Sequence, residues 1–209
     1  MIQTRNQYLQ FMLVMLAAWG ISWGARFVME QAVLLYGSGK NYLFFSHGTV
    51  LMYLLCVFLV YRRWIAPLPV VGQLRNVGVP WLVGAMAVVY VGVFLLGKAL
   101  ALPAEPFMTK LFADKSIPDV ILTLLTIFIL APLNEETLFR GIMLNVFRSR
   151  YCWTMWLGAL ITSLLFVAAH SQYQNLLGLI TSVARIRSGG LLLPVLLHME
   201  ATTLGLLFG

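Results

Sequence analysis

Residues 118–140 read PDVILTLLTIFILAPLNEETLFR. This stretch joins an apolar run, Pro118–Leu133, to a charged cluster that contains Glu135, Glu136 and Arg140. The apolar run is slightly shorter than the roughly 17–20 residues that a membrane-spanning helix needs, so we expect the helix to continue through the cluster. Because ionisable groups inside a span commonly cost a few kcal/mol each, these charges require a structural or functional reason.

The rest of the chain is equally apolar. Hydrophobic residues make up 61% of the 209 residues and charged residues 10%, and the mean hydropathy is +0.89. Soluble domains carry about a quarter charged residues, so this chain cannot build a water-facing surface. Further apolar runs of near-spanning length occur along the whole chain: Tyr8–Ala25, Tyr42–Tyr61, Val79–Gly97, Trp153–Ala169 and Leu191–Phe208.

These runs are continuous rather than alternating, which indicates helices and not barrel strands. A shorter helix is expected at Gln174–Ala184, ending at the Gly189–Gly190 pair. The sequence therefore predicts an all-α fold: a polytopic membrane helix bundle of about seven transmembrane helices, with six to eight as the range. We expect a single integral membrane domain, residues 1–209.

The basic residues are distributed unequally between the predicted loops. If the N-terminus is cytosolic and seven segments follow, eight positive residues face the cytosol and four face outward, as the positive-inside rule requires. The cytosolic group is Arg5, Arg62, Arg63, Arg75, Arg148, Arg150, Arg185 and Arg187, and the external group is Lys40, Lys98, Lys110 and Lys115. The net charge of +7 is thus topological, and no nucleic-acid binding is expected.

The two carboxylates of the charged cluster differ in their possible partners. Glu136 and Arg140 are four residues apart and can pair on one helix face. Glu135 is rotated by about 100° from Glu136 and cannot share that pairing equally. A desolvated carboxylate of this kind suits proton transfer near neutral pH. A structural ion network that locks two helices is the alternative.

Two histidines lie in or beside later spans. Each of His170 and His198 alone fits an interhelical hydrogen bond. Together with Glu135 they place one carboxylate and two imidazoles on three helices, a set that can activate water with or without a metal. Glu135 and His198 lie at similar depths, about 20 Å and 16 Å from Arg148 and Arg187 along their helices. His170 agrees less well and would need a tilted or broken helix.

Three motifs resemble those of a known family. EETLFR at 135–140 fits Glu-Glu-x-x-x-Arg, and FVAAH at 166–170 fits Phe-x-x-x-His. RIRSGG at 185–190, followed by Pro194 and His198, is similar to the segment that leads into His-x-x-x-Asn/Asp. The chain therefore resembles the CPBP intramembrane proteases, also called the CAAX protease and bacteriocin-processing, Abi or Rce1-like family. The resemblance covers residues 118–209, which would form the catalytic core.

The resemblance implies a role for each motif residue. Glu135 and His170 would activate the attacking water, while Glu136 and Arg140 would shape and hold their helix. His198 and the residue four positions later would stabilise the oxyanion. That residue is Thr202 in place of the family's Asn or Asp. Its hydroxyl can donate one hydrogen bond to an oxyanion, or bond its own helix backbone instead.

The resemblance also implies the activity and its setting. We expect an intramembrane endopeptidase that processes a membrane-associated peptide or protein, including lipidated ones such as prenylated CAAX proteins. No cofactor is favoured, because the sequence has no His-Glu-x-x-His motif. Zinc held by Glu135, His170 and His198 is the alternative. The small size and the absence of targeting extensions favour the cytoplasmic membrane of a prokaryote.

Two other function classes remain open. A non-catalytic immunity or peptide-binding protein fits the Thr202 departure. A small proton-coupled transporter could use Glu135 and the histidines as a relay, although no inverted repeat is visible. One further charged pair is expected to be structural, and the role of one further glutamate is left open. Arg26 and Glu30 should form a salt bridge, and Glu200 could pair with Arg140 or Arg26 or carry protons.

Overall fold

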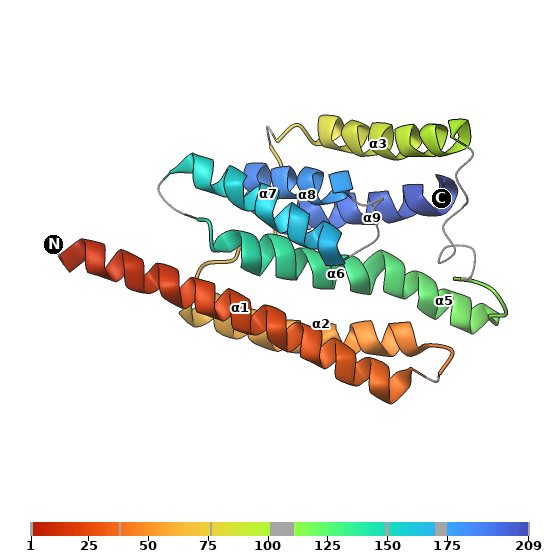
Figure 1. The fold of residues 1–209 in the computed structure, drawn as a ribbon, viewed down its shortest axis with the longest axis horizontal. Helices are drawn as coiled ribbons and strands as arrows, with labels where there is room; N and C mark the ends of the chain where they lie inside the picture. The colour runs from red at the N-terminus through yellow and green to blue at the C-terminus, as the bar shows by residue number, and fades with distance from the viewer. Residues whose placement is uncertain are drawn as a thin grey trace.

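The structure is a computed structural model that describes residues 2–37, 39–75, 77–100, 111–148, 151–169 and 175–208. Within these ranges all regular elements are helical and there is no strand, so the predicted all-α bundle is confirmed. The helices run along one long axis, and the N- and C-termini lie at opposite ends of it (Figure 1). This arrangement fits an odd number of passes between the two ends.

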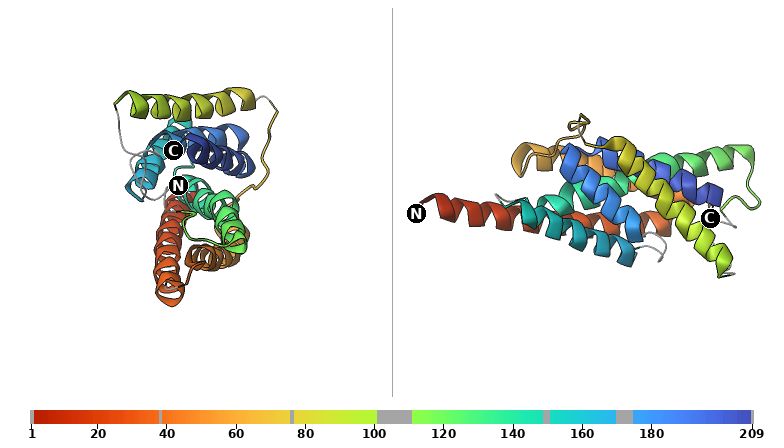
Figure 2. Two further views of the ribbon diagram at one scale, coloured as in Figure 1. Left: turned by 90° about the vertical axis from the view of Figure 1, so that its right-hand side faces the viewer. Right: turned by 90° about the horizontal axis from the view of Figure 1, so that it is seen from above.

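The first two helices form an antiparallel hairpin on one side of the bundle (Figure 2). Helix α1 covers Ile2–Tyr36 and α2 covers Tyr42–Trp64. They meet along a buried seam whose members include Val14, Ala18 and Leu54. The helix continues beyond Ala25, where the predicted apolar run ends, to Tyr36. Arg26 Nε lies 2.8 Å from Glu30 Oε1, as expected.

The central helix is continuous through the charged cluster, as the short apolar run predicted. It consists of α5 (Ile117–Leu125), a π-helical turn η1 (Thr126–Leu130), α6 (Ala131–Glu136) and a second π-helical segment η2 (Thr137–Met143). Its start is fixed by a capping box between Ser116 and Asp119.

Pro132 does not interrupt the central helix. The widened turn η1 precedes it, and the Ala131 N–H bonds to the Thr126 carbonyl in the i→i+5 pattern. A proline lacks an N–H and its ring crowds the preceding turn, so a π-turn placed just before it accommodates both defects. The central helix gives way to a turn at Val146–Phe147.

The other helices form the second half of the bundle. These are α3 (Val79–Ala99), α7 (Cys152–Ala169), α8 (Asn175–Ser188) and α9 (Leu192–Phe208). Helix α9 packs between α3 and the central helix, and α8 packs against both α7 and α9. Helix α8 is longer than the predicted Gln174–Ala184. It ends where Gly189 adopts a φ of 68°, a left-handed conformation that favours glycine.

The chain between α2 and α3 folds over the start of α9. The Val70 carbonyl accepts hydrogen bonds from the Leu191 and Leu192 amides at 2.7 and 2.8 Å. The Gln73 amide donates to the Ser188 carbonyl at 2.7 Å. The bonds to Val70 satisfy amides at the start of α9, and the bond from Gln73 joins the same segment to the end of α8.

Four described helices are long and apolar enough to cross a membrane: Tyr8–Tyr36, Tyr42–Trp64, Val79–Ala99 and Ile117–Met143. Two shorter apolar helices, Cys152–Ala168 and Leu192–Phe208, accompany them. Large hydrophobic side chains cover the outside of the bundle, among them Trp81 at 83% exposure and Leu34 at 79%. Such a surface is stable in lipid and not in water, so the chain is a polytopic integral membrane protein.

Candidate active site

Two neighbouring helices bring four of the predicted site residues together. Glu135 and Glu136 end α6, Arg140 lies one turn later in η2, and His198 projects from α9. Helices α6 and α9 are in contact, which places the imidazole beside both carboxylates. The site therefore forms where the central helix crosses the last one.

Glu136 is the centre of a fully buried ion network. Its Oε1 lies 2.8 Å from His198 Nδ1, and its Oε2 lies 3.3 Å from Arg140 Nε. The Glu136 and Arg140 side chains are both 0% exposed. The arginine contact is an ion pair without hydrogen-bond geometry, whereas the histidine contact is a directed hydrogen bond. A buried carboxylate is stable only with such partners.

Glu135 has a different environment. Its side chain is 18% exposed, and its Oε2 lies 3.7 Å from His198 Nε2. The two ring nitrogens of His198 thus face two different carboxylates. A separation of 3.7 Å is too long for a direct hydrogen bond, and a water molecule can bridge two polar atoms separated by more than 3.5 Å.

A phenylalanine from α7 packs against both the arginine and the histidine. The Phe166 ring centroid lies 4.5 Å from Arg140 Cζ and 5.9 Å from the His198 ring centroid. Phe166 is itself 0% exposed and packs edge-on against Phe139. This aromatic contact stabilises the guanidinium by a cation–π interaction. Phe166 opens the Phe-x-x-x-His motif, but the sequence did not indicate which residues it contacts.

The other predicted site residues are placed as follows. His170 lies outside the described residues, which in α7 end at Ala169. Thr202 is one turn beyond His198 on α9, and its hydroxyl donates to the His198 carbonyl at 3.1 Å. Of the two alternatives for this threonine, the structure shows the bond to its own helix backbone.

Glu200 forms neither of the expected ion pairs. Arg140 contacts Glu136 and Arg26 contacts Glu30, and no described basic group pairs with Glu200. The reason is its position on α9, where residues 198 and 200 differ by about 200° around the helix axis. Glu200 therefore points away from the ion network.

Asn134 links the site to α2. Its Nδ2 donates to the His47 carbonyl at 2.9 Å, and its side chain is 5% exposed. The sequence indicated nothing about this contact, because a side-chain bond between residues 47 and 134 leaves no local pattern. It fixes the turn that carries Glu135 against the first hairpin.

The zinc alternative has two of its three ligands in place. Glu135 and His198 are adjacent, and His170 lies outside the described residues. Among the residues that the structure describes, no three His, Cys, Asp or Glu side chains converge as a metal site. The Nε2 atom of His198 is the nitrogen that could face a metal, since Nδ1 is bound by Glu136.

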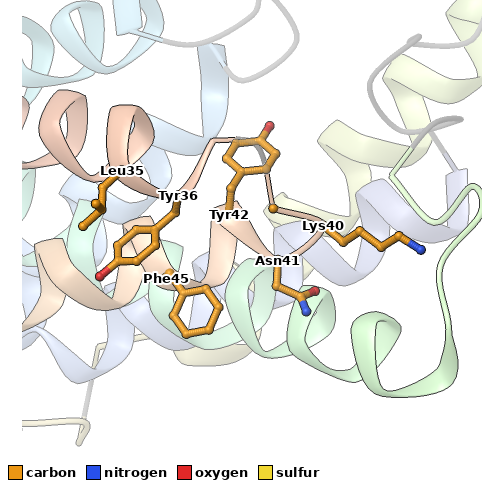
Figure 3. Close-up of a pocket in the computed structure, with 7 residues that line it drawn as sticks. Leu35, Tyr36, Lys40, Asn41, Tyr42 and Phe45 are labelled. Carbon is orange, nitrogen blue, oxygen red and sulfur yellow. The ribbon is translucent and has the colours of Figure 1, made fainter.

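A surface pocket of about 300 Å³ lies at the turn between α1 and α2 (Figure 3). Tyr36 and Phe45 pack against each other beside it, with ring centroids 5.3 Å apart. Asn41, also in its lining, donates to Asp119 at 2.7 Å. Asp119 precedes Glu135 by 16 residues, or about 24 Å along the helix, so this pocket is separate from the ion network.

Comparisons with known proteins give two similarities. Residues 117–204 match the family described as type II CAAX prenyl endopeptidase Rce1-like. This segment contains the ion network and Thr202. The whole chain is 96% identical, over an alignment of 217 residues that covers 100% of both proteins, to an uncharacterized 24.3 kDa protein of Escherichia coli. No solved structure matches the chain.

Proposed function

We propose that this chain, whose residues 117–204 match the Rce1-like family of type II CAAX prenyl endopeptidases, is an intramembrane endopeptidase whose nucleophilic water is activated by Glu135. One observation carries the proposal. A partly exposed carboxylate, Glu135, lies 3.7 Å from an imidazole nitrogen that a second, fully buried carboxylate orients. Ionisable groups arranged in this way inside a membrane span are a functional site by default.

In the proposed reaction a water molecule lies between Glu135 Oε2 and His198 Nε2. Glu135 removes a proton from this water as the oxygen attacks the scissile carbonyl carbon. The carbonyl π electrons move onto oxygen and form the tetrahedral oxyanion. The proton on Glu135 then passes to the leaving amide nitrogen as the C–N bond breaks. Atoms and charge balance, because the water ends as one hydroxyl and one hydrogen on the two products.

Glu136 and Arg140 act on the reaction through His198. A carboxylate only accepts hydrogen bonds, so the 2.8 Å contact places a proton on His198 Nδ1. If Nε2 is also protonated, the imidazolium offers an N–H to the developing oxyanion. The net charge of the cluster is then zero, because the two glutamates balance Arg140 and the imidazolium of His198. A buried cluster is most stable without net charge.

His170 and Thr202 complete the proposal. We assign His170 to the activation of the water together with Glu135, following the family motif. Thr202 can serve as a second oxyanion donor only if its hydroxyl leaves the His198 carbonyl. We therefore expect oxyanion stabilisation to rest mainly on His198.

We propose that the reaction is metal-free, since the ligand spacing typical of zinc peptidases is missing from the sequence. If zinc were bound, it would polarise the water and the scissile carbonyl as a Lewis acid. Elemental analysis of the purified protein tests this choice. Less than one tenth of an equivalent of zinc per active chain, with activity that survives a chelator, supports the metal-free mechanism. Loss of activity on chelation and its return with zinc contradict it.

The proposed substrate is a membrane-associated peptide or protein. The family name indicates a prenylated C-terminal CAAX segment, and leader peptides or bacteriocins are substrates of the same chemical class. We place the protein in the cytoplasmic membrane of a prokaryote with a cytosolic N-terminus. The near-identical protein from Escherichia coli supports the prokaryotic part of this proposal.

A non-catalytic, peptide-binding role is the second candidate, because the Thr202 hydroxyl is held by its own helix. Purified protein in lipid vesicles, incubated with a library of lipidated and unlipidated peptides, separates the two. Cleavage by the native chain and its loss in Glu135→Gln support the peptidase. Saturable peptide binding without products, in both proteins, supports the second candidate. Glu30→Gln is the matched control, because Glu30 also pairs with an arginine four residues away but lies outside the site.

A further inference from the structure

The second π-helical segment of the central helix leaves a carbonyl without its usual partner. In an α-helix the Leu144 amide would bond to the Arg140 carbonyl, but here it bonds to the Phe139 carbonyl. The Arg140 carbonyl instead accepts a hydrogen bond from Arg185 Nε of α8, at 3.1 Å. Arg185 is only 7% exposed, so this donor is buried together with the carbonyl it satisfies.

The guanidinium end of the Arg140 side chain also lies against α8. A Cβ atom at Gly178 would lie 3.1 Å from Arg140 Nη2 and 3.2 Å from Ser163 of α7. A side chain at this position would crowd the guanidinium, so Gly178 gives it more room between α7 and α8. Gly178 and Arg185 are seven residues apart, which puts them on the same face of α8, two turns from each other. One helix face thus holds both the backbone and the side chain of Arg140.

We propose that Arg185 is a positioning residue of the site. Its N–H fixes the widened turn of η2, which sets the direction of the Arg140 side chain. Arg140 in turn holds Glu136, and Glu136 orients the His198 imidazole. The catalytic consequence of this chain of contacts rests on the proposed function, whereas the contacts themselves do not.

The alternative role of Arg185 is that of a positive charge that sets membrane topology. Arg187 separates the two roles, because it lies two residues later on the same helix and its side chain is exposed. An exposed arginine can serve topology without touching the site. The Arg185 side chain instead donates a hydrogen bond to a buried backbone carbonyl.

A matched pair of variants tests whether the donor or the charge matters. Arg185→Gln removes the charge but keeps an N–H donor the same number of bonds from the backbone as Nε. Arg185→Met keeps a stem of similar length and offers no donor. Arg187→Met is the control for loss of a positive charge at this end of α8.

The first measurement is the ¹⁵N NMR signal of the His198 side chain. The chain has three histidines, so selective ¹⁵N labelling gives a spectrum simple enough to assign His198 by its own substitution. We expect Arg185→Met to shift the His198 Nδ1 signal and to speed amide exchange in residues 137–145 by about tenfold, the effect of leaving a buried acceptor unsatisfied. Arg185→Gln and Arg187→Met should resemble the native protein in both measurements. A native-like Arg185→Met, or equal shifts in Arg185→Gln and Arg185→Met, would overturn the proposal.

Catalytic activity provides a second, independent measurement. With a cleaved peptide in hand, Arg185→Met should lower kcat by about tenfold and leave KM nearly unchanged, because an oriented imidazole acts in the transition state. An unchanged kcat together with a shifted His198 signal would remove the catalytic part of the inference. If the spectra behave as expected and the native protein cleaves nothing, the proposed function fails while the positioning of Arg140 by Arg185 stands.

Discussion

Glu135 and Glu136 are adjacent in the sequence, yet they have different surroundings. The Glu136 carboxylate is sealed between Arg140 and His198, and the Glu135 carboxylate is partly exposed beside the other nitrogen of the same imidazole. The helical rotation between neighbours predicted this division, since only Glu136 is four residues from Arg140. The sequence could not show that a single histidine faces both.

Replacing Glu136 tests its structural role. Glu136→Gln leaves the Arg140 guanidinium buried without a carboxylate, so we expect a loss of about 3 kcal/mol in the free energy of unfolding. Unfolding in mixed micelles, followed by circular dichroism, measures the change. The matched control is Glu30→Gln, which removes an exposed partner of Arg26 and should alter stability little. Equal stability of the two variants would contradict the buried network.

Thr202 distinguishes this chain from the family pattern. Because its hydroxyl donates to the His198 carbonyl, Thr202→Val should change kcat by less than about threefold. Thr202→Asn should raise kcat, since an amide reaches further and one oxyanion donor contributes about a hundredfold or more. Kinetics on any cleaved peptide give both values. A large loss in Thr202→Val would show that the hydroxyl does contact the oxyanion.

At the level of elements, the sequence predicted the helices and missed how they are joined. Apolar runs identified each long helix, and Gly189–Gly190 predicted the break before α9. The π-turns of the central helix were not predictable, because they depend on Pro132 and on a donor from α8. The contact of Val70 with Leu191 and Leu192 was also missed, since backbone pairing across more than a hundred residues leaves no local pattern.

The segment between α2 and α3 carries a core residue. Leu68 is 1% exposed and packs where Gly141 and Leu191 meet. We expect Leu68→Ala to destabilise the protein by about 2–5 kcal/mol, the range for truncating a buried leucine. Val71→Ala is the control, because Val71 is 60% exposed. Thermal unfolding in detergent measures both, and equal midpoints would contradict the packing described here.

Loops that carry arginines come together at one end of the molecule. The chain around Gly72 meets Gly190, and the Arg187 side chain approaches Gly78, so loops distant in sequence gather there. This is the end that the positive-inside rule assigns to the cytosol. The termini lie at opposite ends of the long axis (Figure 1), which fits an odd number of passes.

Reporter fusions test this topology. We expect a green fluorescent protein fused before residue 1 to fluoresce, because that fold forms in the cytosol. Alkaline phosphatase fused after residue 209 should be active, because that enzyme needs the oxidising side of the membrane. A fusion after Arg148, in the predicted cytosolic loop, is the control and should be inactive as a phosphatase. An inactive C-terminal phosphatase would mean an even number of crossings and would contradict the arrangement.

The central claim is that Glu135 activates water to hydrolyse a peptide bond within the membrane. Its most direct test is cleavage of membrane-associated peptides by the reconstituted protein in ¹⁸O-labelled water, followed by mass spectrometry of the products. The native chain should yield products whose new carboxyl group carries one ¹⁸O atom, and a correctly inserted Glu135→Gln protein should yield none. Labelled products from both proteins at the same rate would contradict the account.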